Sequence, residues 1–140
     1  MRGRAQSIGP DEAEFSEAWI EGDATARWES APTHGSGSGA GSSGSSMLRV
    51  GVGCRLPRHT DSAEETIVVL SGAAVVVTAD GERRLSAEAI AVIPAALPHE
   101  VRNAGESELR FAAIYADADV ITTYEADVQP DGEPTRRAVP

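Results

Sequence analysis

Residues 53–72 decide the fold of this chain, and they read GCRLPRHTDSAEETIVVLSG. His59, Asp61 and Glu65 occupy positions of equal parity in this stretch, and alternate residues of a β-strand lie on one face. The apolar Ile67 continues the same parity. The sequence therefore predicts a strand wall that begins with polar side chains and continues as apolar core.

A second polar cluster follows at residues 94–103, which read PAALPHEVRN and place His99 at the start of another strand. Two imidazoles with one or two carboxylates, brought together from neighbouring strands, suit Fe, Mn, Zn, Ni or Cu. The candidate metal-binding side chains are therefore His59 and His99, with Asp61, Glu65 or both. Glu64 has the opposite parity, which predicts a solvated position.

Short runs rich in β-branched residues alternate with turn signals along most of the chain. This spacing is typical of an all-β sandwich or barrel and not of βαβ units. Asp80-Gly81 between two such runs predicts a hairpin. The expected strands are Ala24–Glu29, Met47–Val52, Glu65–Ser71, Ala73–Ala79, Glu82–Leu85, Ala89–Ile93, His99–Asn103, Glu108–Tyr115 and Val120–Tyr124.

The length of 140 residues predicts one domain with three parts. Residues 1–22 form an N-terminal arm, with Pro10 and Asp11 favouring a short helix over Glu12–Ile20. Residues 23–125 form the barrel, interrupted by a mobile Gly/Ser loop at 35–46. Residues 126–140 form a polar C-terminal tail that we expect to be loosely held.

Composition narrows the class of protein. All 12 basic residues are arginine and 22 residues are acidic, and the net charge of −10 argues against binding nucleic acid or an anionic membrane. The single cysteine excludes an intramolecular disulfide. No apolar run has the length of a membrane span, and the N-terminus lacks a secretory signal. We therefore expect a cytoplasmic protein.

The two polar segments resemble the paired motifs of the cupin superfamily, G-x5-H-x-H-x3/4-E-x6-G and G-x5-P-x-G-x2-H-x3-N. The matching positions are Gly53, His59, Glu65 and Gly72 for the first motif, and Pro94, His99 and Asn103 for the second. The resemblance implies a small single-domain cupin: an antiparallel jelly-roll β-barrel with one divalent metal inside. By position, it implies His59, Glu65 and His99 as ligands.

Three positions depart from the cupin pattern. Asp61 stands where the family usually has its second histidine, while Glu88 and Ala96 stand where it has glycines. The two glycine replacements are expected to alter turn detail only. Asp61 is either a fourth ligand or a neighbour of a three-ligand site. As a fourth ligand it would make the site harder and more anionic, which favours Mn, Fe or Zn over Cu.

The resemblance implies a metal-dependent enzyme of the dioxygenase, isomerase or lyase type that acts on a small oxygenated or anionic metabolite. The alternative is a cupin that binds a small molecule without turnover. Arg55 shares parity with His59 unless Pro57 breaks the strand, so it is a candidate for holding a substrate anion.

A homodimer is the expected assembly, because small cupins commonly pair through sheet edges and N-terminal segments. Phe15, Trp19 and Ile20 are the candidate contacts for such a dimer. No partner of nucleic-acid or membrane type is expected.

Overall fold

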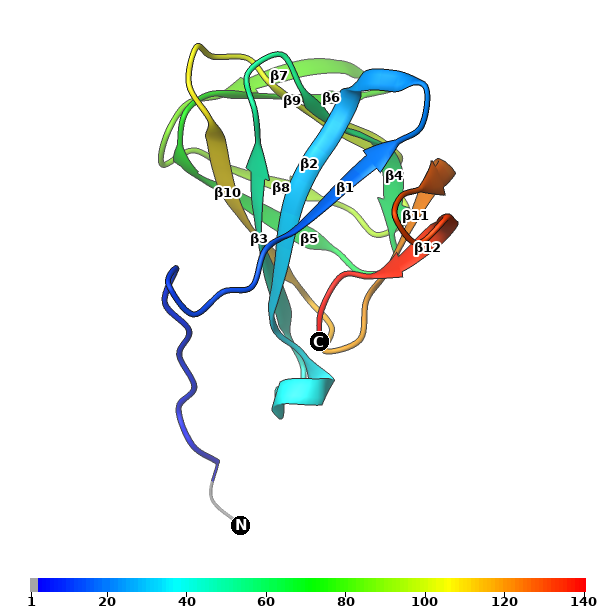
Figure 1. Ribbon diagram of the computed structural model, residues 1–140. Coiled ribbons are helices and arrows are strands. Elements are labelled where there is room, and N and C mark those ends of the chain that lie inside the picture. Colours follow the sequence, from blue (N-terminus) through cyan, green and yellow to red (C-terminus); the bar gives the residue numbers. More distant parts are fainter. Residues whose placement is uncertain (1–2) are drawn as a thin grey trace.

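The computed structural model describes residues 3–140, which form β-strands joined by turns and one 3-10 turn, η1 (Ser36–Ser38) (Figure 1). The all-β fold class predicted from the run lengths is therefore confirmed. In chain order the strands are β1 (Ser16–Ile20), β2 (Asp23–His34), β3 (Gly44–Val50), β4 (Arg55–Asp61), β5 (Glu65–Ser71), β6 (Ala74–Thr78), β7 (Gly81–Leu85), β8 (Ile90–Ile93), β9 (His99–Asn103), β10 (Leu109–Tyr115), β11 (Ile121–Val128) and β12 (Glu133–Arg137).

The strands form two layers that curl into a nearly closed barrel (Figure 1). One layer has the order β1-β2-β3-β10-β5-β8. The other has the order β7-β6-β9-β4-β11-β12. These pairings are antiparallel, and a parallel contact between Ala26 and Arg55 joins the layers. The arrangement is the jelly-roll barrel that the cupin resemblance implied.

Strand β5 shows how sequence alternation builds the core. Ile67 and Val69 are 0% and 1% exposed, whereas Leu70 on the other face is 47% exposed. Phe111 of β10, the neighbouring strand, is fully buried beside Val69, its partner in register. The apolar part of the predicted face therefore points into the barrel. Its polar start is divided between two strands, because His59 and Asp61 lie on β4 in the other layer and only Glu65 lies on β5.

The helix predicted over Glu12–Ile20 is wrong, because residues 16–20 form strand β1. Ala18 lies opposite Trp28 of β2, and its side chain is fully buried. The apolar residues near the end of this segment fit a strand as well as a helix. Pairing with β2 decides between the two, because it satisfies backbone groups along the strand.

The Gly/Ser tract at residues 35–46 contains η1 and the start of β3, and it packs against the C-terminal residues. A Cβ atom at Gly35 would lie 2.5 Å from the carbonyl oxygen of Pro140, and one at Gly44 would lie 2.6 Å from Cγ1 of Val139. Only glycine permits so close an approach. The tail predicted to be loosely held contains β12, and Val139 is 1% exposed.

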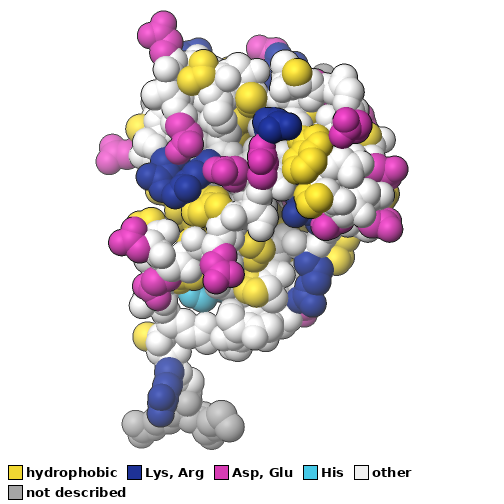
Figure 2. Space-filling model, in the orientation of Figure 1, with side chains coloured by type: hydrophobic (Ala, Val, Ile, Leu, Met, Phe, Trp, Pro, Cys, Tyr) yellow, Lys and Arg dark blue, Asp and Glu magenta, His cyan; other side chains and the backbone are white. Residues whose placement is uncertain are grey.

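The surface carries the excess of acidic residues seen in the sequence. Figure 2 shows Asp and Glu side chains scattered over one face, with arginines among them. No helix within residues 3–140 is long and apolar enough to span a membrane.

Candidate metal centre

Four polar side chains meet inside the barrel. His59 and His99 are cross-strand partners on β4 and β9, Asp61 ends β4, and Glu65 begins β5 after a short turn. The four residues are 1–4% exposed. One donor atom from each lies within 4.8 Å of the other three. The structure thus brings together all four residues that the sequence put forward, whereas Glu64 is exposed.

Backbone carbonyls orient both imidazoles. Nδ1 of His59 lies 2.7 Å from the carbonyl oxygen of Pro57, and Nδ1 of His99 lies 2.8 Å from that of Leu97. A carbonyl can only accept, so each Nδ1 carries the proton and donates. In the neutral ring each Nε2 then keeps its lone pair and faces the cluster, which is the usual way in which a protein prepares histidine for a metal.

The two carboxylates differ in their surroundings. Glu65 Oε1 lies 3.0 Å from Nε2 of His99. Asp61 Oδ1 accepts a 2.6 Å hydrogen bond from the hydroxyl of Thr122 on β11. Asp61 Oδ2 is buried and has no hydrogen-bond partner among the described residues, although it lies 3.7 and 3.6 Å from Nε2 of His59 and His99.

This donor set fits a divalent cation. A buried oxygen without a partner is costly, and a cation bound at that point would remove the cost. Donor atoms that share one ion at about 2.0–2.2 Å lie no more than about 4.4 Å apart. The observed limit of 4.8 Å needs only a slight contraction to meet that condition.

Burial shifts the titration of the cluster. Burial, and then the nearby His99, lowers the pKa of His59 to about 4, so His59 is neutral near pH 7. Burial also raises the pKa of Glu65 to about 6. For His99, burial lowers the pKa, but the hydrogen bond and charge of Glu65 outweigh it and the pKa lies above its ordinary value.

Arg55 does not line the cavity around the cluster. Its guanidinium instead pairs with Asp23 and, at 2.7 Å, with Glu100. The register of β4 against β9 shifts between Leu56 and His59, so parity does not carry across Pro57. The structure therefore separates this predicted anion-binding residue from the four others.

The cavity beside the cluster has a volume of about 140 Å³. Its wall includes Tyr115, Tyr124, Thr122 and Arg136 besides the polar cluster. Sequence reasoning missed these four residues as cavity lining, and neither Thr122 nor Arg136 belongs to a motif. Thr122 has the same parity as Tyr124 within the expected strand Val120–Tyr124, and this alternation could have indicated Thr122.

The two glycine replacements keep the backbone conformation that glycine serves. Glu88 has φ of 73° and Ala96 has φ of 64°, both in the left-handed region. The amide of Ala96 donates a 2.8 Å hydrogen bond to the carbonyl oxygen of Asp61. The turn after β8 thus helps to hold the backbone of Asp61 in place, although Ala96 in this turn has a strained positive φ.

The chain belongs to the cupins, because residues 46–115 match the family described as Cupin domain. No curated protein matches the chain by sequence.

Solved structures share its fold. A sugar phosphate isomerase of the cupin superfamily from Silicibacter pomeroyi is 20% identical, with a TM-score of 0.69 over 94% of this chain and 92% of that one. The polyketide cyclase RemF from Streptomyces resistomycificus is 16% identical, with a TM-score of 0.65 over 80% and 79%.

Oxalate decarboxylase from Bacillus subtilis is also similar, at 20% identity and a TM-score of 0.57 over 71% of this chain. The match covers 27% of the decarboxylase, so this chain spans only about a quarter of its length. At these identities the similarity shows the fold alone.

Proposed function

We propose that this cupin holds one divalent transition metal with His59, Asp61, Glu65 and His99 and uses it to act on a small oxygenated or anionic metabolite. The observation that carries the proposal is the buried Asp61 Oδ2, which lacks a hydrogen-bond partner among the described residues and faces two oriented Nε2 atoms. Thr122 holds the other oxygen of the same carboxylate.

Two imidazoles and two carboxylates form a hard, anionic donor set. Such a set favours Mn, Fe or Zn, with Ni and Cu less well suited. Manganese has a parallel among the similar structures, since one of them concerns Mn(II) centres in Bacillus subtilis oxalate decarboxylase.

The reaction we propose is of the dioxygenase, isomerase or lyase type. A bound metal would polarise a carbonyl or activate oxygen or water. The residues of the chain would hold the metal, and Tyr115 and Tyr124 line the cavity beside it. Burial raises the pKa of the Tyr124 hydroxyl, so it stays protonated and able to donate a hydrogen bond.

The test is metal content by mass spectrometry on protein purified without added metal. His99→Ala and Glu65→Ala should each abolish stoichiometric metal binding. Glu64→Ala is the matched control, because it removes an exposed neighbouring carboxylate. Unchanged metal in the first two variants would refute the proposal.

The alternative is a cupin that binds a small molecule without turnover. One observation favours it: apart from the cluster residues His59, Asp61 and Glu65, the described cavity wall contains no carboxylate or imidazole to serve as a general acid or base. Metal-loaded protein that binds ligands but neither consumes oxygen nor forms product across a broad substrate panel would support this alternative.

We also propose a cytoplasmic homodimer, with Phe15, Trp19 and Ile20 in the contact. All three residues are only half-buried in the single chain. Light scattering coupled to size-exclusion chromatography should give twice the mass of 14.6 kDa. A monomer mass would refute the dimer.

A further inference from the structure

We propose that Arg136 binds an oxyanion group of the ligand at the wall of the metal cavity. The inference rests on the proposed function, and it names a residue and a ligand class: a small carboxylate or phosphate, held between a guanidinium and the metal.

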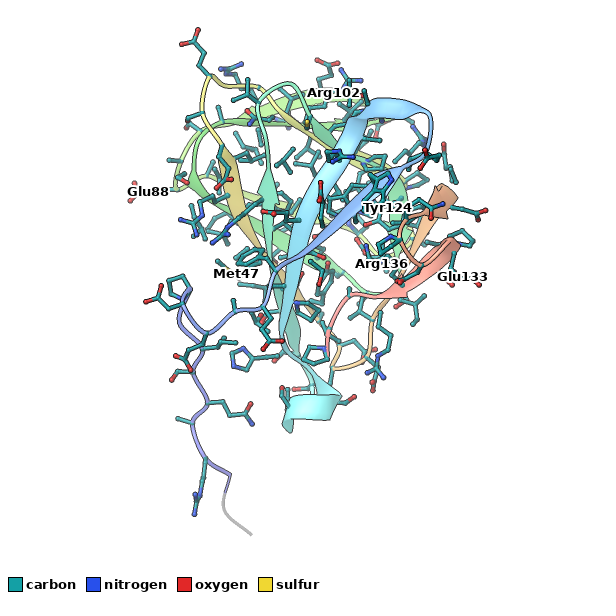
Figure 3. The ribbon with its side chains drawn as sticks, viewed as in Figure 1. Met47, Glu88, Arg102, Tyr124, Glu133 and Arg136 are labelled. Carbon is teal, nitrogen blue, oxygen red and sulfur yellow. The ribbon has the colours of Figure 1, made fainter. Side chains whose placement is uncertain are left out.

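The pairing of the last two strands turns Arg136 toward the cavity. Arg136 of β12 lies opposite Thr122 of β11, and directly opposed residues of an antiparallel pair project to the same face. Thr122 is buried and bonded to Asp61, so this face is the inner one. Figure 3 shows Arg136 close to Tyr124 on this side of the barrel.

The alternation of β12 supports this orientation. Pro134, Arg136 and Ala138 are half-buried, whereas Thr135 and Arg137 between them are exposed. The inner face of the strand therefore carries a charged side chain between two apolar ones. Such a placement costs free energy unless the charge has a partner.

Arg136 forms no ion pair within residues 3–140, unlike its neighbours in sequence and space. Arg137 also borders the cavity, but its guanidinium pairs with Asp119 at 3.3 Å, and Arg58 pairs with Glu125 of β11. A planar guanidinium that is half-buried and unpaired offers two parallel donors, which match a carboxylate or phosphate.

The charges of the site favour an anion once the metal is present. Asp61 and Glu65 together balance the two charges of a divalent ion, which leaves the charge of Arg136 uncompensated. The cavity of about 140 Å³ resembles in size a protein cavity of about 150 Å³ that binds benzene. The part of the ligand inside the cavity is therefore small.

The test is calorimetric titration of Mn²⁺-loaded protein with oxalate and, separately, with inorganic phosphate. Arg136→Gln should weaken binding of the preferred anion about tenfold or more, because it removes a charge-assisted pair. Arg136→Lys keeps the charge but loses the two parallel donors, so its anion affinity should lie between those of wild type and Arg136→Gln. Arg58→Gln is the matched control: it removes the same charge from a half-buried position outside the cavity and should leave the affinity unchanged.

The outcomes distinguish failure of the Arg136 proposal from failure of the proposed metal site. Tighter binding of oxalate identifies a carboxylate ligand, and tighter binding of phosphate identifies a phosphate ligand; either supports the inference if Arg136→Gln weakens it. Metal content is measured before and after each titration and should be the same in all variants. Equal anion affinity in Arg136→Gln and wild type, or no binding of either anion, overturns the role of Arg136 and leaves the metal site standing. A wild-type protein that binds no metal overturns both.

Discussion

Two parts of the molecule contribute to one cavity in different ways. One is the wall, by which we mean β4 and β9 of one layer together with β5 of the other, and the second is the hairpin of β11 and β12. The wall supplies four buried metal-binding candidates from positions with fixed spacing. The hairpin supplies Thr122, Tyr124 and Arg136, which match no motif and reach the cavity only through strand pairing. On the proposed function, the wall would set which cation binds, and the hairpin would be free to set which ligand binds beside it.

Loss of a wall donor should have the largest effect. Asp61→Ala should lower metal affinity by more than about 100-fold, since outer partners of a ligand already cost about 10–100-fold. Tyr124→Phe, on the hairpin, keeps the ring that packs 5.2 Å from that of His59. It should change the affinity by less than about threefold, below the range for outer partners. Competition with a fluorescent chelator measures both, and equal losses would contradict the division between wall and hairpin.

Metal should stabilise the fold by binding the four candidate ligands of the wall. Metal at about 100 times its Kd should raise the free energy of unfolding by about 2.7 kcal/mol, because the ion binds only the folded state. Urea denaturation with metal and with chelator gives the difference. His99→Ala should show none, and an equal rise in that variant would place the ion elsewhere.

Thr122 is the hydrogen-bonded link from hairpin to wall. Thr122→Val removes the donor to Asp61 Oδ1 and should lower metal affinity about 10–100-fold. Thr123→Val is the control, because Thr123 is exposed on the opposite face. If the two variants bind metal equally well, the hairpin does not orient the carboxylate.

The smallest expected effect is on stability, from the strained turns on either side of β8. Glycine accepts a positive φ without the cost that a Cβ atom brings, so Ala96→Gly and Glu88→Gly should each stabilise the fold by about 0.5–1 kcal/mol. Ala87→Gly, an exposed neighbour without positive φ, should instead destabilise it by about 0.5–1 kcal/mol. Thermal denaturation of the metal-free proteins compares them, and destabilisation by all three would refute the strain.

Local patterns predicted β5 and β9 well, but they gave no separate strand for β4 and none for β12 of the hairpin. The bounds of β5 and β9 agree with the predicted runs because β-branched residues and turn signals delimit both. The spacing also brought forward His59, Asp61, Glu65 and His99, which the structure places together.

The errors arise where tertiary pairing overrides the local signal. β12 reads EPTRR, a polar run with a proline that no strand pattern matches, and pairing with β11 makes it a strand. Arg55 lies outside the cavity, because a register shift near Pro57 breaks the alternation on which its candidacy depended. The segment of β1 fits two periodicities, and only its partner β2 selects one.

The Gly/Ser tract contacts the end of the chain, so residues outside the cavity can affect the position of residues that line it. Gly35 and Gly44 pack closely against Val139 and Pro140, which follow the strand that carries Arg136 after one residue. A side chain at either glycine would clash with that end, and we expect the end to shift and to move Arg136 with it. We therefore expect this tract, although it has the composition of a flexible linker, to influence the position of Arg136. Exchanging it for another loop of equal length should change ligand affinity before it changes metal content.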